Sequence, residues 1–129
     1  MTPREAENRR LLRARDAIDR DYADPLDVPA LARIAHVSSS HFSRSFKATF
    51  GETPHRYLQR RRIERSMALL RDTTTPVTDV ALAVGFASLG TFSRTFRDIV
   101  GASPSDYAQR PRGLAAPVCF IKDWMRPAG

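Results

Sequence analysis

The chain has 129 residues, of which 42% are hydrophobic and 27% charged, and this composition is typical of one compact globular domain or two very small ones. Its 21 lysines and arginines exceed the 14 acidic residues by seven, which gives a formal net charge of +7. No apolar stretch approaches the roughly 20 residues that span a bilayer, the N-terminus lacks an apolar signal segment, and a single cysteine cannot form an internal disulfide. We therefore expect a basic, soluble, cytoplasmic protein.

Capping residues and helical spacing predict the first elements in chain order. After an N-terminal helix, Asp27 is a suitable N-cap for a short helix that ends near a break at residues 36–37. Ser38 or Ser39 then caps a second helix, and Gly51 suits the C-terminus of that helix. Aromatic residues recur every four positions within it, at Phe42, Phe46 and Phe50. This stripe is expected to be buried.

A longer helix is predicted next, with Thr53 as N-cap and Pro54 in its first turn. Its extent, residues 53–71, corresponds to roughly 28 Å at about 1.5 Å per residue. It carries five arginines, at positions 56, 60, 61, 62 and 65, which cannot all face one way. We expect some of them to meet phosphates, and at least one to form an internal ion pair with Glu64 or with the acidic first helix.

The second half of the chain repeats the first. His41–Lys47 recurs as Thr91–Arg97 at an offset of 50 residues, and the segment 51–57 matches 101–107 at the same offset. Upstream, residues 31–35 match residues 80–84 at an offset of 49. The chain therefore contains two copies of one supersecondary unit.

The same capping pattern predicts the helices of the second copy. Thr75-Pro76 is expected to start its first helix, Gly85 to form the turn, and Ser88 to cap the helix that contains Phe92 and Phe96. The residues expected to end that helix and to start the last one are Gly101 and Ser103-Pro104.

These elements predict an all-α fold of about seven helices, because no segment alternates convincingly with period two. Two tandem helix-turn-helix subdomains are expected, joined by a long linker helix. The predicted boundaries are 1–52 for the N-terminal helix and first subdomain, 53–71 for the linker and 72–110 for the second subdomain. The tail, 111–129, is expected to be irregular, with an apolar segment around Val118–Ile121 that docks on the body or, alternatively, on a partner.

The charge distribution and the helical geometry point to nucleic acid. Residues 33–71 hold nine basic side chains and only two acidic ones, whereas the rest of the chain is balanced at twelve of each. In a helix-turn-helix unit the second helix enters the major groove. The positions predicted to bind DNA are Ser40, Ser43, Arg44 and Lys47 in the first unit and Gly90, Thr91, Arg94 and Arg97 in the second; all are expected to face outward except Ser43 and Thr91, which flank the outward face. Arg44 and Arg94 occupy equivalent centres and suit a bidentate contact with guanine.

From about Ala17 to Gln109 the chain resembles the DNA-binding domain of the AraC/XylS family of transcriptional regulators. The residues that carry the resemblance are Leu31-Ala32, Ser43-Arg44, Phe46-Lys47, Gly51, Pro54, Tyr57-Leu58, Leu69-Leu70, Val80-Ala81, Gly85-Phe86, Phe92–Phe96, Gly101, Ser103-Pro104 and Tyr107. The resemblance implies two helix-turn-helix subdomains on a long helix, asymmetric sites in double-stranded DNA, and activation of transcription through contact with RNA polymerase. It places base contacts at Ser40, Ser43 and Arg44 and at Gly90, Thr91 and Arg94.

Two positions depart from the family pattern. His36 stands where the first turn commonly has glycine, and histidine tolerates a left-handed backbone better than bulkier residues. Gly90, beside Leu89, leaves the start of the second recognition helix without long polar side chains. We therefore expect the first unit to dominate sequence specificity.

The overall expectation is a regulator that acts as a monomer, like the small stand-alone members of the family; the alternative is a DNA-binding fragment of a larger effector-gated regulator. An RNA-binding or protein-adaptor module is the competing hypothesis from another class. No enzyme, metal or cofactor is expected, because the three histidines lack ligand spacing and neither a phosphate-binding loop nor a nucleophile motif is present.

Overall fold

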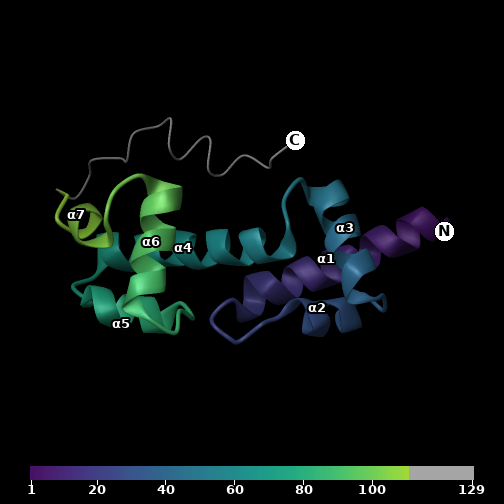
Figure 1. Cartoon of the computed structure of the whole chain (residues 1–129), viewed down its shortest axis with the longest axis horizontal. Helices are drawn as coiled ribbons and strands as arrows, with labels where there is room; N and C mark the ends of the chain where they lie inside the picture. Colours follow the sequence, from purple (N-terminus) through teal and green to yellow (C-terminus); the bar gives the residue numbers. More distant parts are fainter. Residues whose placement is uncertain (111–129) are drawn as a thin grey trace. The chain divides into compact units, whose positions relative to one another are not determined.

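The computed structural model describes residues 1–110, and within this range the chain forms seven α-helices and no strand (Figure 1). The helices are α1 (Pro3–Asp21), α2 (Val28–Ile34), α3 (Ser39–Phe50), α4 (Pro54–Asp72), α5 (Val77–Ala83), α6 (Leu89–Val100) and α7 (Pro104–Ala108). None of the helices in this range is long and apolar enough to cross a membrane. The tail predicted to be irregular, 111–129, lies outside the described residues.

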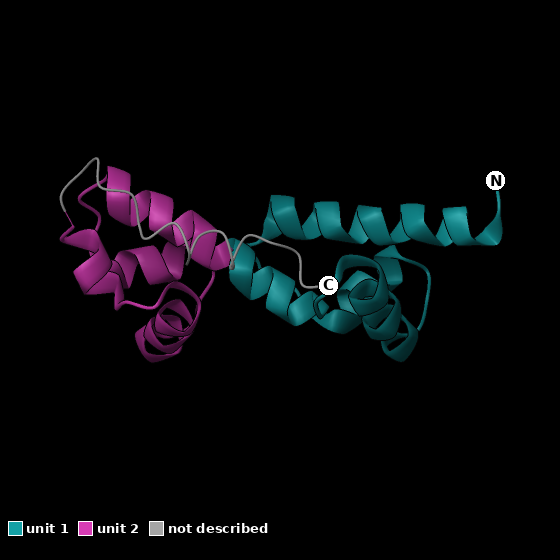
Figure 2. Ribbon diagram, turned by 90° about the horizontal axis from the view of Figure 1, so that it is seen from above, with its two compact units in different colours: residues 1–61, 127–129 teal, residues 62–126 magenta. Residues whose placement is uncertain are grey.

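The described chain divides into two compact units, residues 1–61 and residues 62–110 (Figure 2). Each unit contains one predicted helix pair, α2–α3 in the first and α5–α6 in the second. The all-α, tandem helix-turn-helix fold is thus confirmed. The division falls within α4, so the separate linker of residues 53–71 remains a prediction.

The helix ends follow the local sequence. The side chains of Asp27, Ser38, Ser88 and Ser103 accept hydrogen bonds from backbone N–H groups in the first turns of α2, α3, α6 and α7. Thr53 caps α4 in the same way, through Arg56 N at 3.1 Å. At the other ends, Gly51 and Gly101 adopt left-handed conformations with φ of 83° and 90° after α3 and α6. These caps confirm the predicted helix ends because each one depends on residues only a few positions apart.

One predicted start is wrong. Thr75 does not cap α5; the N-cap residue is Pro76, which has an extended backbone and supplies no side-chain hydrogen bond. Instead the Thr75 backbone N–H and hydroxyl both contact the hydroxyl of Thr73. The hydroxyl of Thr73 also donates to the carbonyl of Leu69 near the end of α4. Because the Thr75 hydroxyl and N–H are bonded to Thr73, Thr75 stays in the connecting loop and does not bond to the first turn of α5.

The turns inside the two helix pairs share one backbone path. His36 has φ of 58° and Gly85 has φ of 103°, and each is followed by a residue whose N–H reaches back into the preceding helix. These bonds are Val37 N to Ala32 O at 3.1 Å and Phe86 N to Ala81 O at 3.0 Å. The left-handed backbone expected at His36 is present, because the turn geometry is the one that glycine provides in the second unit.

Each unit has its own core around the aromatic stripe of its second helix. In unit 1, Phe42 and Phe46 are fully buried, and Phe46 packs against Tyr57 with ring centroids 5.8 Å apart. In unit 2, Phe92 and Phe96 are fully buried, and Phe96 packs against Tyr107 at 5.6 Å. Phe42, Phe46, Phe92 and Phe96 are thus core residues, as predicted, whereas Phe50 at the end of the first stripe is only partly buried against the same core.

The structural repeat extends one helix further upstream than the sequence repeat. Leu11, Ala14 and Ile18 of α1 are buried in unit 1. Buried residues with the same spacing occur in α4, at an offset of 52: Ile63, Ser66 and Leu70. The C-terminal half of α4 therefore buries in unit 2 the positions that α1 buries in unit 1.

Candidate nucleic-acid interface

The outer face of α3 carries the predicted residues of the first unit. Ser40, Arg44 and Lys47 are exposed, and Ser43 is half-buried. Phe42 and Phe46 lie on the opposite, buried side of the same helix. Because successive residues of a helix advance about 100° around the axis, the buried stripe forces these polar side chains toward solvent.

The outer face of α6 repeats this arrangement with different chemistry. Gly90, Thr91, Arg94 and Arg97 are all exposed. The Thr91 hydroxyl lies 3.0 Å from Ser88 Oγ, which also caps the helix by accepting from Thr91 N. The Thr91 hydroxyl thus accepts from Ser88 within the cap and keeps its own O–H as a donor for a ligand.

The first turn of α6 has few polar side chains that could contact a ligand. A Cβ atom at Gly90 would lie 3.9 Å from a terminal guanidinium nitrogen of Arg94, so Arg94 leans toward the N-terminus of the helix and over the glycine. Leu89, one residue earlier, is 43% exposed although it is apolar. This end of α6 thus combines one guanidinium with apolar surface.

These two faces have the groups needed to read base edges. A guanidinium can bind guanine O6 and N7 together, and serine or threonine hydroxyls contact either bases or phosphates. Arg44 and Arg94 lie at equivalent positions of α3 and α6, 50 residues apart in the sequence, and both are exposed. Lys47 and Arg97 follow these arginines by about one helical turn and suit phosphate oxygens.

The arginines of α4 behave differently from those of α3 and α6. Arg60 pairs with Glu52 at 3.0 Å, with both side chains almost buried, and Arg61 pairs with Asp19 of α1 at 3.1 Å. Arg62 lies over the ring of Phe86 at 5.8 Å, and burial lowers its pKa. The expected pairing with the acidic first helix is present, whereas the pairing with Glu52 was not anticipated. At least these three arginines contribute to packing inside their own units.

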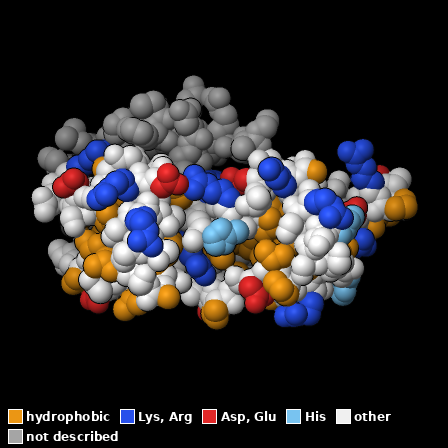
Figure 3. Space-filling model, viewed as in Figure 1, with side chains coloured by type: hydrophobic (Ala, Val, Ile, Leu, Met, Phe, Trp, Pro, Cys, Tyr) orange, Lys and Arg blue, Asp and Glu red, His pale blue; other side chains and the backbone are white. Residues whose placement is uncertain are grey.

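Figure 3 shows acidic side chains directly beside basic ones at several places on one face. Within residues 33–71, Arg60 and Arg61 are each paired with a carboxylate. The excess of basic residues in this segment therefore overstates the positive charge that it presents to a ligand.

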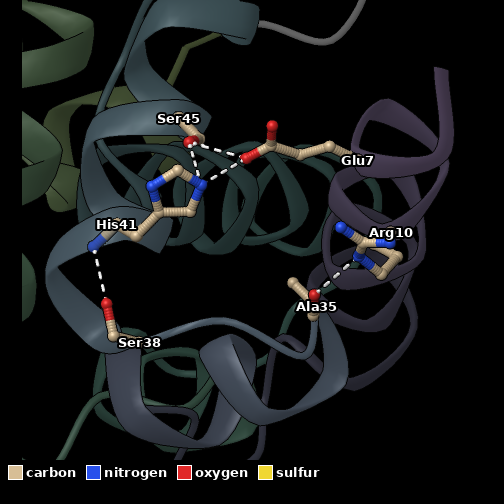
Figure 4. Close-up of polar contacts among 6 residues, drawn as sticks. All are labelled: Glu7, Arg10, Ala35, Ser38, His41 and Ser45. Carbon is tan, nitrogen blue, oxygen red and sulfur yellow. Dashed lines mark hydrogen bonds and ion pairs between the residues drawn. The ribbon is translucent and has the colours of Figure 1, made fainter. Parts of the chain in front are cut away.

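A polar cluster between α1 and α3 was missed from the sequence. Glu7 Oε1 is hydrogen-bonded to His41 Nε2 and accepts from Ser45 Oγ at 3.0 Å (Figure 4). These hydrogen bonds, chiefly the one from His41, hold the pKa of Glu7 below its usual value. No local pattern could have revealed the cluster, because Glu7 lies 34 and 38 residues from its partners.

Known proteins share this fold and sequence pattern. A family model described as "Helix-turn-helix domain" matches residues 31–110. A "Putative AraC-like transcription regulator" of Streptomyces antibioticus is 41% identical over 71 residues, which are 55% of this chain and 23% of that protein. The chain spans less than a third of the length of such curated relatives.

Solved structures agree with these sequence relatives. "A probable AraC family transcriptional regulator" from Rhodopseudomonas palustris CGA009 is 31% identical, with a TM-score of 0.74, and covers 81% of this chain and 98% of its own. The DNA-binding domain of AdpA, "the global transcriptional factor", solved in complex with a target DNA, is 29% identical with a TM-score of 0.70, covering 76% of this chain and 88% of its own.

Proposed function

The chain belongs to the AraC family of helix-turn-helix transcription regulators, and from this premise we propose that it binds specific sites in double-stranded DNA, with α3 and α6 as its recognition helices. The prediction that it is not an enzyme is confirmed by this family membership. The similar domain of AdpA was solved with a target DNA, which supports the choice of partner.

The observation that carries the proposal is the equivalent exposure of Arg44 and Arg94. Each lies on the outer face of the second helix of its unit, opposite a stripe of fully buried phenylalanines. On this proposal Arg44, with Ser40 and Ser43, reads bases for the first unit, and Arg94 does so for the second. Leu89 offers an apolar contact suited to a thymine methyl group.

Burial of the aromatic residues argues against RNA as the partner. Sequence-specific RNA binding usually stacks splayed bases on exposed aromatic rings. Phe42, Phe46, Phe92 and Phe96 are instead fully buried, and Phe86 is 4% exposed. Duplex DNA, read by side chains on helix faces, fits the exposed groups better.

We further propose that one chain uses both helices in successive major grooves. One turn of DNA is about 34 Å long, and the nineteen residues of α4 correspond to a helix of roughly 28 Å. In this proposal a monomer acts in the cytoplasm, and it activates transcription through RNA polymerase, as the family resemblance implies.

The first experiment is selection of binding sites from a random duplex library at near-physiological salt. Two enriched sequence blocks about one helical turn apart support base reading by both units. A single block supports a regulator in which α6 holds only the DNA backbone, whereas no enrichment contradicts the proposal.

Arginine variants then test the named residues on the selected site. Arg44→Ala is expected to weaken specific binding by about 1–3 kcal/mol and to relax specificity at one position. Arg13→Ala is the matched control, since it removes the same charge from an exposed position of α1 in the same unit. Equal weakening of specific and random duplexes by Arg44→Ala would show that Arg44 contacts phosphate rather than a base.

A further inference from the structure

Three side chains from two helices converge beside the first recognition helix, around one carboxylate oxygen. Glu7 Oε1, in the second turn of α1, contacts His41 Nε2 and Ser45 Oγ, and these two atoms are 3.2 Å from each other (Figure 4). His41 and Ser45 are one helical turn apart, so both point from α3 toward α1. The cluster is only partly exposed, with 46% of the His41 side chain and 31% of the Glu7 side chain accessible.

A second contact fixes the other helix of the same pair. Arg10, three residues after Glu7, donates from Nε to the carbonyl oxygen of Ala35 at 3.1 Å, just beyond the end of α2. Helix α1 therefore contacts the C-terminal end of α2 through Arg10 and the N-terminal part of α3 through Glu7. Leu11 and Ile18 of α1 share one buried cluster with Phe42 and Phe46, which fixes the buried face of α3. The directional hydrogen bonds restrict the smaller rotations about the axis of α3 that this packing still permits.

The cluster also borders the proposed reading face. His41 is adjacent in sequence to Ser40 and three residues from Arg44, which places it on the flank of that face nearest α1. A carboxylate at this edge repels incoming phosphates, so its presence weakens the general electrostatic attraction for DNA.

We propose that Glu7 is a positioning residue for DNA reading: through His41 and Ser45 it sets the rotation of α3, so that Ser40 and Arg44 meet base edges. This inference rests on the proposed function. It assigns a role in specificity to an acidic side chain outside the helix pair, which favours base-specific binding while it weakens binding to DNA in general.

Charge and position make opposite predictions for Glu7→Gln, and this difference is the basis of the test. The substitution raises the net charge by one, so electrostatics alone predicts tighter binding to every duplex. The amide oxygen of glutamine can still accept from His41 and Ser45, but as an uncharged acceptor it does so more weakly than the carboxylate. If Glu7 positions α3, binding to the selected site therefore weakens by about three- to tenfold, while binding to random duplex is unchanged or slightly tighter. The two dissociation constants are measured by fluorescence anisotropy at one salt concentration.

Glu5→Gln is the matched control. Glu5 is an exposed carboxylate on the same helix, and the hydrogen bond it makes with Thr2 uses its backbone N–H, which the substitution leaves in place. This variant is expected to tighten specific and random binding equally. If Glu7→Gln behaves like Glu5→Gln, with the ratio of the two constants unchanged, the inference is overturned.

A pair of substitutions at Ser45 distinguishes loss of the hydroxyl contact from a general loss of stability. Ser45→Ala is expected to lower the ratio of random to specific dissociation constants, whereas Ser45→Thr keeps the hydroxyl and restores the ratio. Threonine fits this helix position, because Thr95 occupies the equivalent place in α6. Loss of the ratio in both variants to the same extent overturns the role of the hydroxyl.

The outcome separates the inference from the proposed function. If the unmodified chain shows no preference between selected and random duplex, the proposed function fails and no variant is needed. If the preference exists and Glu7→Gln preserves it, the function stands and the positioning role fails. Thermal unfolding of each variant identifies any that is unfolded at the assay temperature. If Glu7→Gln is unfolded, Glu7→Asp takes its place. The same loss of preference is expected for Glu7→Asp, because its carboxylate lies one methylene further from His41 and Ser45.

Discussion

Tyr57 is the clearest case of a single side chain whose chemistry depends on the fold. Its hydroxyl donates to Asp19 Oδ1 at 2.7 Å, and the same oxygen pairs with Arg61 at 3.1 Å. Burial, followed by the hydrogen bond to Asp19, raises the pKa of Tyr57 to about 12. The phenol therefore links α1 to α4 within unit 1 only in its protonated form.

This linkage predicts a loss of stability at alkaline pH. Since the pKa of Tyr57 is higher in the folded than in the unfolded state, its contribution is complete below about pH 10 and is lost as the pH rises from about 10 toward 12. Tyr57→Phe is expected to cost about 1–2 kcal/mol at pH 7, because Asp19 loses one donor. The difference in unfolding free energy between the two proteins, measured by urea denaturation, is expected to shrink above pH 10; a constant difference up to pH 11 would contradict this assignment.

Single residues also decide how the arginines are used. Arg44 and Arg94 lie on helix faces whose opposite sides are filled by buried phenylalanines, which leaves their guanidinium groups in solvent. Arg60 and Arg61 have the same chemistry, but each faces a carboxylate within its own unit. Composition treats these four residues alike, whereas their packing separates a candidate base reader from a structural cation.

At the scale of elements, the two helix pairs show how one turn geometry can be built from different residues. His36 has φ of 58°, within the left-handed region that histidine can occupy, while Gly85 has φ of 103°, which lies beyond the region that residues with a Cβ atom commonly adopt. The turns therefore differ in their tolerance of substitution although they connect equivalent helices.

Paired alanine substitutions are expected to reveal this difference. Gly85→Ala is expected to destabilise the protein by about 1–2 kcal/mol, because the new Cβ atom strains the backbone. His36→Ala, which replaces a residue that already carries a Cβ atom in the left-handed region, is expected to cost less than about 1 kcal/mol. Urea denaturation of both variants provides the measurement, and an equal cost at the two positions would show that the backbone strain is not the deciding factor.

The helix that precedes each pair is the element whose role depends most on context. Ser66 in α4 occupies the position that corresponds to Ala14 in α1, is fully buried, and donates its hydroxyl to the carbonyl of Ile63 at 2.7 Å. A polar residue is tolerated there because its hydrogen bond is satisfied within the helix. As a result α4 can close unit 1 with its first half and support unit 2 with its second.

At the scale of the whole molecule, one chain contains two candidate recognition helices, α3 and α6, each in a unit with its own core. Simple repressors obtain two such helices by forming a dimer. A chain with both has no need of a second copy to contact two half-sites, and this is the physical basis for the monomer proposed above.

The expected stoichiometry follows from this argument. Sedimentation of the protein with a duplex that carries the selected site should give one chain per duplex, and the free protein should sediment as a monomer. Binding should also weaken steeply as salt is raised, because phosphate contacts release counterions. Two chains per site would show instead that each chain uses only one of its helices and that α4 does not set the spacing.

The sequence by itself determined the features that depend on near neighbours. Helix caps such as Ser38 and Ser88, the left-handed glycines after α3 and α6, and the buried phenylalanine stripes all follow from residues within one or two turns of each other. The repeat of 50 residues then predicted a second unit, and burial of one stripe placed Arg44 and Arg94 on exposed faces. Thr75 is the exception, since a neighbouring hydroxyl displaced it from the cap.

Only the tertiary structure decided which distant residues meet. The contacts of Glu7 with His41, of Asp19 with Tyr57 and Arg61, and of Arg10 with Ala35 join residues 25 to 42 positions apart. Such contacts depend on how the helices pack and rotate, and helical periodicity shows which face of a helix is buried but not which partner covers it. For that reason the exposed face of α3 could be predicted from the sequence, while the α1 side chains that contact α3 could not.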